Sequence, residues 1–481
     1  MLNKRVSLSC KESGLLRGRG QGVALLLILA MGMGVSKAQD AEVHYIEYNY
    51  IEYPGILGQV QPLVWSGVPK WATFDVELRG RLEAQSSLDY VSGNGQAYLL
   101  TRDYEGLQVR PTKFLTGYIQ SIDTHAFGMP PKEIAANMRD VFDCRQAYLE
   151  FHINPAEFAP VELYAGRFEL KYGGERLVGI SDWTNNSRSW DGFLGRFGDK
   201  NRLDLFATSV VAVTPVALDK HGAGLTFFGA VGTIGTWVPH IAIQPFVYVK
   251  SFPRVESQQG VFGVETIATP GLEAAGTLPN GFNFDALVAW QRGSYSNDSV
   301  VASADYFKAG YLSQKAFWKP RMMGEYDYAS GNSRKNLFAI NTFDQQYPSN
   351  HNAFGLTDLF GFQNIKQERI NLDLTPVKRV TVLIQQEWLQ VASRFDNIYS
   401  GSAGTVVKAP TTGLQSGDIG HEFDASGKWV ITDYLVMNAG VGHFSPGTAM
   451  RDNAHGAPLT LAYMSLTYRF KVNNPHAAPA P

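Results

Sequence analysis

The sequence has few charged residues, only two cysteines and no series of long apolar runs. Charged residues make up 18% of the chain, whereas aromatic residues reach 12% and glycines number 48. This composition excludes a disordered chain and a coiled coil. Because repeated apolar runs of about 20 residues are missing, a bundle of transmembrane helices is excluded as well. The formal charge of −2 gives no basic footprint for nucleic acid, so no nucleic-acid partner is expected.

The N-terminus predicts a signal peptide over residues 1–38. A basic leader precedes an apolar run from Val23 to Met33, too short to span a bilayer; an uncleaved anchor is the alternative. The small residues Ser36 and Ala38 place the cleavage site before Gln39. The leader holds six basic residues and one acidic residue, so its removal from totals of 42 and 44 leaves a net charge of about −7. No intrachain disulfide is then available, so burial and backbone pairing must hold the mature chain together.

Apolar and charged residues alternate from Phe74 to Leu88. On a helix the charges of this segment would point in every direction, whereas on a strand they share one face. The pattern runs for about 15 residues, although ordinary strands have about five or six and tilted membrane-spanning strands about 9 to 11. Apolar residues outside and charges inside are expected when lipid surrounds the strand and water lies within.

The same alternation recurs to the C-terminus. About eighteen strands are predicted, beginning near Ala72, Tyr98, Phe114, Val141, Val161, Ser187, Asn201, Gly222, His240, Gly260, Phe282, Val300, Pro320, Asn364, Val380, Gly417, Leu435 and Leu459. Connections after even-numbered strands are short, as at 110–113 and 376–379. Several of those after odd-numbered strands are long, as at 173–186 and 331–363. Short periplasmic turns and long external loops are typical of outer-membrane barrels.

The predicted fold is all-β: a transmembrane antiparallel up-and-down β-barrel of about 18 strands over residues 72–470. A short periplasmic lead-in segment (39–71) is expected before it and a disordered C-terminal tail (471–481) after it. A β-sandwich or a propeller also alternates, but its strands are shorter, and a propeller repeats at about 40 residues. No such repeat is seen. The expected location is the bacterial outer membrane.

One block resembles a known family. Residues 166–179 read GRFELKYGGERLVG, and residues 181–191 read SDWTNNSRSWD. This is similar to the alginate export family of outer-membrane barrels, which reads GRQELxYGDxRLVG, then DWxN, then RxFD. The chain departs from it with Phe168 for Gln, Gly174 for Asp and Trp190 for Phe. The resemblance covers about residues 72–470 and implies an eighteen-stranded barrel that passes an anionic polysaccharide outward through a basic constriction.

Strand parity predicts which charged residues line the lumen. In the block, Arg167, Glu169 and Lys171 would share one strand face, with Arg188 and Asp191 on the next strand. The predicted pore-lining, substrate-binding residues are Arg79, Arg81, Arg167, Glu169, Lys171, Arg188, Asp191 and Arg369. Guanidinium groups in a narrow pore attract a passing carboxylate, and interleaved carboxylates keep that binding weak enough for release. The alternative is charge pairing across the lumen of a general porin.

These observations predict an outer-membrane channel for export or diffusion of an anionic, alginate-like polysaccharide. A general diffusion porin for small solutes is the first alternative, and a barrel hydrolase or adhesin acting through its external loops is the second. No enzyme activity, catalytic residue, metal or cofactor is expected, since His421-Glu422 lacks the second histidine of a zinc-protease motif. The expected partners are the anionic polysaccharide or oligosaccharide, outer-membrane lipid and lipopolysaccharide, and periplasmic export proteins.

Overall fold

The computed structural model describes residues 63–64, 68–153, 159–222, 224–333, 338–351 and 353–473. The predicted signal peptide, most of the lead-in segment and residues 474–481 of the predicted tail lie outside these described residues. Within them, no helix is long and apolar enough to cross a membrane.

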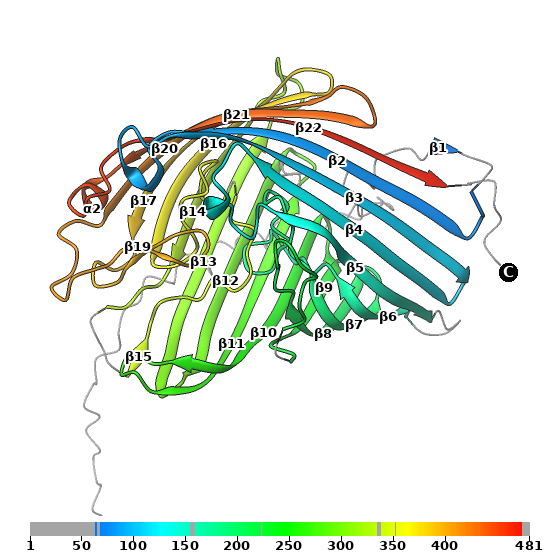
Figure 1. Cartoon of the computed structure of the whole chain (residues 1–481), viewed down its shortest axis with the longest axis horizontal. Helices are drawn as coiled ribbons and strands as arrows, with labels where there is room; N and C mark the ends of the chain where they lie inside the picture. The colour runs from blue at the N-terminus through cyan, green and yellow to red at the C-terminus, as the bar shows by residue number, and fades with distance from the viewer. Residues whose placement is uncertain are drawn as a thin grey trace, which may run out of the picture. The chain divides into compact units, whose positions relative to one another are not determined.

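The described residues form a closed antiparallel barrel of eighteen strands (Figure 1). Neighbours in the chain are neighbours in the wall, and the first strand pairs with the last, from Phe74 opposite Val472 to Gln85 opposite Leu461. The wall strands are β2 (Ala72–Gln85), β3 (Gln96–Thr112), β4 (Leu115–Phe127), β5 (Asp140–Ile153), β6 (Val161–Phe168), β7 (Trp190–Gly198), β8 (Asn201–Val210), β9 (Phe227–Val238), β10 (Ile241–Glu256), β11 (Phe262–Thr277), β12 (Phe282–Tyr295), β13 (Asp298–Leu312), β14 (Arg321–Ala329), β16 (Ile365–Val377), β17 (Val380–Val391), β20 (Asp418–Val430), β21 (Leu435–Pro446) and β22 (Leu459–Asn473).

The other elements are short. They are β1 (Leu63–Val64), β15 (Ala339–Ile340), β18 (Ile398–Tyr399), β19 (Thr405–Val407), the 3-10 helices η2 (Leu88–Tyr90) and η3 (Pro131–Glu133), and α2 (Thr448–Arg451). β1 and β15 extend the sheet by parallel pairing with β22 and β13, whereas β18 and β19 form a separate hairpin. The prediction of an eighteen-stranded barrel is confirmed.

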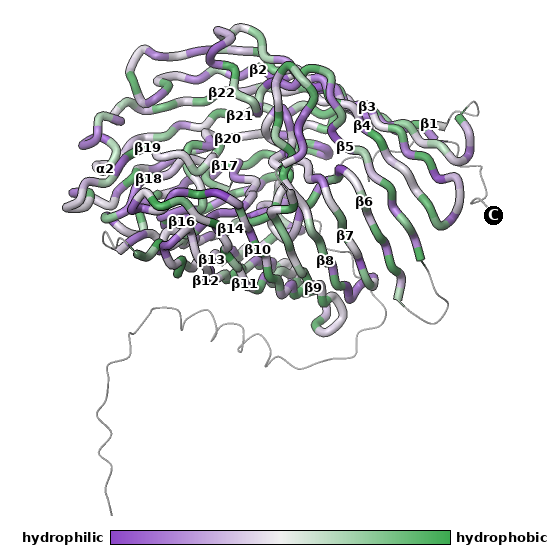
Figure 2. Tube along the Cα trace, turned by 60° about the horizontal axis from the view of Figure 1, so that its bottom comes forward, coloured by the Kyte–Doolittle hydropathy of each residue, from purple (hydrophilic) through white to green (hydrophobic). Residues whose placement is uncertain are grey.

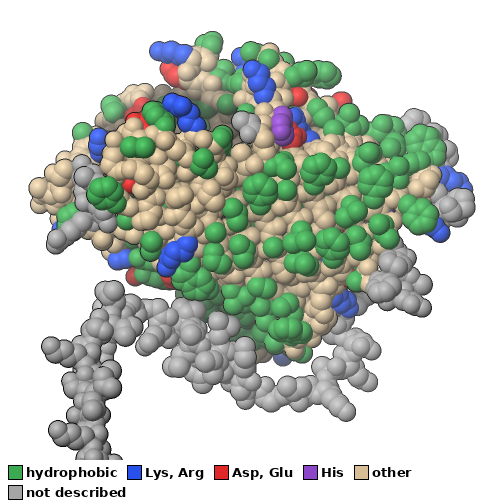
Figure 3. Space-filling view, turned by 90° about the horizontal axis from the view of Figure 1, so that it is seen from below, with side chains coloured by type: hydrophobic (Ala, Val, Ile, Leu, Met, Phe, Trp, Pro, Cys, Tyr) green, Lys and Arg blue, Asp and Glu red, His purple; other side chains and the backbone are tan. Residues whose placement is uncertain are grey.

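Alternation sets the two faces of the wall, as the hydropathy of the trace shows (Figure 2). On β2, Phe74 and Leu82 are 41% and 52% exposed, whereas Arg79 is 3% exposed. Hydrophobic side chains cover the broad face of the wall seen in Figure 3, and charged side chains lie mostly along its edges. An apolar exterior with charges turned inward matches a barrel surrounded by lipid.

Connections alternate in length between the two ends of the barrel. One end has short turns, including 113–114, 199–200, 239–240 and 378–379. The other end has the long connections, including 169–189, 330–364, 392–417 and 447–458. This arrangement agrees with the parity expected of periplasmic turns and external loops.

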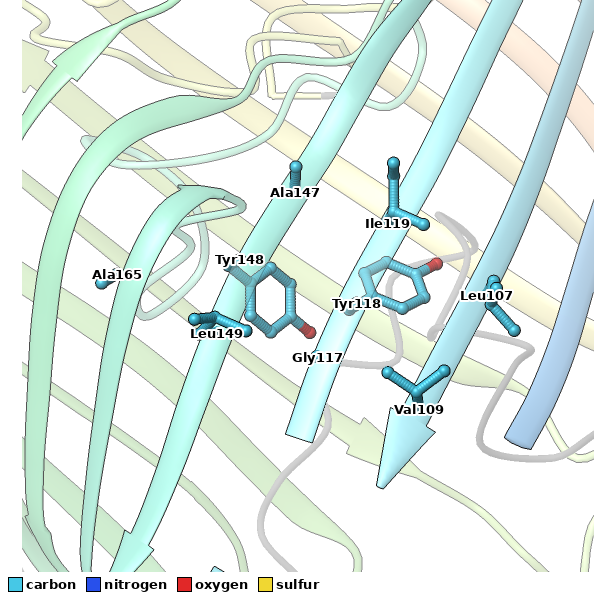
Figure 4. Close-up of a pocket in the computed structure, with 9 residues that line it drawn as sticks. All are labelled: Leu107, Val109, Gly117, Tyr118, Ile119, Ala147, Tyr148, Leu149 and Ala165. Atoms are coloured by element: carbon cyan, nitrogen blue, oxygen red, sulfur yellow. The ribbon is translucent and has the colours of Figure 1, made fainter. Parts of the chain in front are cut away.

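The outer wall is uneven over β3 to β6. A shallow hollow there is lined by Leu107, Val109, Gly117, Tyr118, Ile119, Ala147, Tyr148, Leu149 and Ala165 (Figure 4). Ile119 and Leu149 on its rim are exposed, and the small residues Gly117, Ala147 and Ala165 leave room between them. The wall facing the lipid is therefore apolar but not smooth at this point.

Candidate functional site in the barrel lumen

Two long connections enter the barrel and pack against its inner wall. The first lumen loop (169–189) joins β6 to β7, and the second lumen loop (338–364) lies between β14 and β16. The loops bind each other: Gly179 N–H donates to Tyr347 O at 2.8 Å, and Tyr347 N–H donates to Leu177 O at 2.9 Å. The first loop also reaches β11, where Gly174 N–H donates to Glu273 Oε1 at 2.7 Å. The lumen is therefore occupied by the chain itself.

An apolar cluster forms inside the barrel, where the sequence predicted a charged and watery interior. It joins inner-wall side chains such as Trp190 and Phe227 to loop side chains such as Phe354 and Phe362. The Phe227 and Tyr347 rings meet edge to face with centroids 4.9 Å apart. Charges do lie inside, but the loops carry apolar residues into the lumen as well, and burying them stabilises the inserted loops.

A row of arginines holds the tip of the first lumen loop. Arg79 donates to Asp182 O at 3.0 Å and to Thr184 O at 2.9 Å. Arg102 donates to Asp182 O at 3.0 Å and also forms an ion pair with its carboxylate at 3.0 Å. Arg469 Nη2 lies 3.8 Å from Asp182 Oδ2. These guanidinium groups come from β2, β3 and β22, so the loop tip is bound where the barrel closes.

Arg81 binds the neighbouring residue of the loop tip through both its backbone and its ring. It donates to Trp183 O at 2.5 Å, and its guanidinium lies 3.9 Å from the centroid of the Trp183 ring. The His351 ring of the second lumen loop stacks on the same indole at 3.6 Å and 6°. Burial, with the charges of Arg81 and Arg79, holds the pKa of His351 well below its usual value. A neutral imidazole is thus compatible with this cationic neighbourhood.

The block from the family resemblance divides between wall and loop. Arg167 on β6 binds both carboxylate oxygens of Asp191 on β7, with Nε at 2.8 Å from Oδ1. However, β6 ends at Phe168, so Glu169 and Lys171 belong to the first lumen loop and do not share a strand face with Arg167. Glu169 forms an ion pair with Arg145 of β5, and Lys171 is exposed.

Arg188 belongs to the first lumen loop and not to β7, which begins at Trp190. Its Nη1 donates to Gly179 O at 2.6 Å, to Tyr347 O at 2.7 Å and to Pro348 O at 3.2 Å. Burial lowers the pKa of Arg188 to about 10, although Tyr347 and Glu175 oppose that shift. Because these hydrogen bonds reach carbonyl oxygens of both loops, Arg188 joins the loops rather than lining an open pore.

Arg369 belongs to a second charge network on another part of the wall. It forms ion pairs with Glu325 and, at 3.9 Å, with Glu387, and Arg176 of the first lumen loop pairs with the same Glu325. Buried inner-wall carboxylates run through this region from β11 to β20: Glu273, Asp285, Glu325, Asp327, Glu387, Glu422 and Asp424. Two of them bind the second lumen loop through the backbone N–H groups of Leu356 and Thr357.

The eight predicted residues therefore do not share one set of contacts. Arg79 and Arg81 bind the same loop tip, Arg167 pairs with Asp191, and Arg369 lies in the carboxylate network. Sequence reasoning missed four arginines of the lumen: Arg102, Arg145, Arg176 and Arg469. The parity of residues 98–104 and 463–469 places Arg102 and Arg469 inward and could have identified them. Arg176 lies in a loop, where parity gives no signal.

Comparison with known proteins agrees with this architecture. The fold is similar to crystal structures of Pseudomonas aeruginosa OccK11 (OpdR), with a TM-score of 0.56 and 11% identity over 85% of this chain and 100% of that one. It is also similar to Acinetobacter baumannii OccAB2, with a TM-score of 0.55 and 9% identity over 84% and 100% of the two chains. A third similar structure is Pseudomonas aeruginosa OpdK with vanillate, with a TM-score of 0.56 and 8% identity over 83% of this chain and 98% of that one.

Identities this low show the fold alone. No curated protein matches the chain. The alginate export family, in contrast, matches residues 70–458, which is most of the barrel and includes both lumen loops. The chain belongs to the alginate export family and is an outer-membrane channel.

Proposed function

We propose that this channel exports an anionic, alginate-like polysaccharide or its oligosaccharides, and that lumen arginines form its constriction. The observation that carries the proposal is the arginine row on one part of the inner wall. Arg469, Arg79, Arg102 and Arg145 come from β22, β2, β3 and β5, and all four are buried against the first lumen loop or its neighbours. Guanidinium groups in a partly dehydrated pore can bind carboxylates with two parallel hydrogen bonds.

The present partners of these arginines suggest how a polyanion would pass. Arg79 donates to neutral carbonyl oxygens of the loop tip, and a carboxylate is the stronger acceptor for a guanidinium. Glu77 stays bound to Arg102 and Arg469 and would limit how tightly an incoming carboxylate is held. Transport requires this balance, because a site that binds too strongly does not release.

Conductance in planar bilayers tests the proposal. Polyuronate should reduce the current through the open level, and Arg79→Gln should raise the half-blocking concentration about tenfold, since a hydrogen bond to a charged group contributes about 1.5–3 kcal/mol. Arg379→Gln is the matched control, because Arg379 lies in the exposed turn 378–379, far in the chain from the first lumen loop, and pairs with the exposed Asp433 at 2.7 Å. If polyuronate blocks the wild type, Arg79→Gln and Arg379→Gln equally, or blocks none of them, the proposal is contradicted and a general diffusion porin for small solutes is favoured.

We also propose that the chain reaches the outer membrane after cleavage between Ala38 and Gln39. Periplasmic export proteins would then deliver the polymer to the end with the short turns, and lipid and lipopolysaccharide would cover the apolar wall. The N-terminal residue of the barrel purified from membranes, determined by mass spectrometry, tests the cleavage site. An intact N-terminus would contradict it.

A further inference from the structure

Three aspartates meet near the end of the barrel that carries the long connections. Asp140 and Asp143 lie at the start of β5, and Asp219 lies in the connection 211–226 between β8 and β9. Each offers a carboxylate oxygen, and these oxygens lie within 4.8 Å of one another. The pairing of β4 with β5 shifts by one residue between Ile122 and Thr124, so Asp140 and Asp143 flank a bulge in β5.

The cluster has fewer hydrogen-bond donors than three carboxylates need. Asp143 accepts the backbone N–H groups of Cys144 and Asp219, and Asp219 accepts Thr214 N–H at 2.6 Å. Asp140 is 1% exposed, and its Oδ1 is buried without a hydrogen-bond partner. A buried carboxylate oxygen that lacks a donor is costly unless another ligand binds it.

Positive charge within the chain does not complete the cluster. Arg167 is a nearby cation, but it binds both oxygens of Asp191 and donates to Cys144 O at 2.8 Å. Asp191 is further paired with His221 at 3.3 Å. Over the residues that the structure describes, no salt bridge reaches Asp140, Asp143 or Asp219. In the described part of the chain, three carboxylates are thus gathered with no basic side chain within 4.0 Å.

We propose that Asp140, Asp143 and Asp219 bind a calcium ion. The site offers only oxygen ligands, which suits a hard cation and disfavours zinc, for which Cys and His are typical ligands. Ca²⁺ accepts six to eight oxygens in flexible geometry, so three carboxylates with neighbouring carbonyls or water can hold it, whereas Mg²⁺ demands a near-ideal octahedron. A bound calcium ion would also supply a ligand contact for Asp140, whose Oδ1 is buried without a hydrogen-bond partner.

Binding would fix the connection 211–226 to the wall. Two contacts already bring it there: Val141 N–H donates to Pro215 O at 3.3 Å, and Asp219 N–H donates to Asp143. Without the cation, repulsion between the carboxylates opposes these contacts. Lys220 follows Asp219 directly and is exposed, so cleavage by trypsin after Lys220 reports how firmly this connection is held.

The test measures binding of radioactive ⁴⁵Ca to the full-length barrel in detergent after treatment with a chelator. The Asp140→Asn and Asp219→Asn variants keep the shape of each side chain and remove one charge. Asp452→Asn is the matched control, because Asp452 is exposed in the connection between β21 and β22. Calcium bound by co-purified lipopolysaccharide contributes equally to every variant.

We expect the wild-type chain to bind one calcium ion. Both cluster variants should bind calcium at least tenfold more weakly, and the control variant should bind it as the wild type does. Calcium should also slow tryptic cleavage after Lys220 at least tenfold in the wild type and not in Asp219→Asn. Equal calcium binding by wild type and both cluster variants overturns the proposal, as does no binding at 10 mM, well above the range of about 10⁻⁴ to 10⁻³ M typical of extracellular sites. Equally tight binding of Mg²⁺ overturns the assignment to calcium. The heat-dependent change in electrophoretic mobility that is typical of folded barrels checks that each variant is folded.

Discussion

The stack of Arg81, Trp183 and His351 predicts how firmly the tip of the first lumen loop is held. Trp183→Ala removes the indole from between a guanidinium at 3.9 Å and an imidazole at 3.6 Å but keeps the backbone carbonyl that Arg81 binds. The cation–π contact contributes about 1 kcal/mol and the ring stack about 1 kcal/mol more. Since about 1.4 kcal/mol corresponds to a factor of ten, a loss of about 2 kcal/mol should raise the fraction of released tips about 30-fold.

Single-channel recording measures that fraction as the share of time spent in conducting levels. Trp388→Ala is the control, because Trp388 lies on β17 and is 44% exposed on the wall. We expect Trp183→Ala to increase both the duration and the frequency of open events, and we expect the control to behave as the wild type does. If Trp183→Ala conducts as rarely as the wild type, the stack does not hold the tip, and the reasoning is refuted.

Three further predictions concern the wall and the second lumen loop. Glu325→Gln should lower the free energy of unfolding by about 1.5–3 kcal/mol, because a neutral amide replaces the carboxylate that two buried arginines share, while Asp327 and Glu387 remain as partners; urea denaturation followed by tryptophan fluorescence measures this. Gly166→Ala should lower the melting temperature, since a Cβ at φ +129° would lie 2.2 Å from the carbonyl oxygen of the facing strand, whereas Gly80→Ala meets open space and should not. In His351→Gln, the fraction of open time should grow as pH rises from about 4 to 7, because burial raises the pKa of Asp358 to about 7 from 3.8 in the docked loop. In Asp358→Asn, the fraction of open time should grow as pH falls below 6.5, because burial lowers the pKa of His351 in the docked loop. A fraction of open time that does not change with pH in either variant contradicts a role for these two groups in holding the loop.

Strand parity predicted the wall well because a membrane enforces it. An apolar residue turned into the lumen or a charge turned into lipid is costly, so the alternation survives along whole strands such as β2. The predicted starts at Ala72, Val161, Asn201, Phe282, Val380, Leu435 and Leu459 coincide with the observed ones.

The interior could not be predicted in the same way. The alternation in the sequence predicts that the strand of Arg167 continues through Lys171. In the structure the chain leaves the wall after Phe168 and turns, and Tyr172 N–H donates to Val178 O. Ser187 was predicted to begin β7, yet its N–H donates to the hydroxyl of Tyr104 across the lumen. Such contacts join residues far apart in the chain, and no short-range period encodes them.

Bulges are the second source of difference between sequence and structure. β4 and β5 shift register twice, so Arg145 and Gln146 are both buried although they are adjacent. Parity inverts after each bulge, and Arg145 could not be assigned to the lumen from its position alone. Asp140 and Asp143 could not be recognised for the same reason, and Asp219 lies in a connection, where parity gives no signal.

The aromatic filling of the barrel limits leakage across the outer membrane. Phe343, Phe354, Phe360 and Phe362 of the second lumen loop are all 0% exposed, and wetting each ring costs at least about 1.5 kcal/mol. Ejecting them together would cost about 6 kcal/mol, a state present in fewer than about one molecule in ten thousand. Brief openings must therefore leave this hydrocarbon seal in place and involve the loop tip that Arg79 and Arg81 bind.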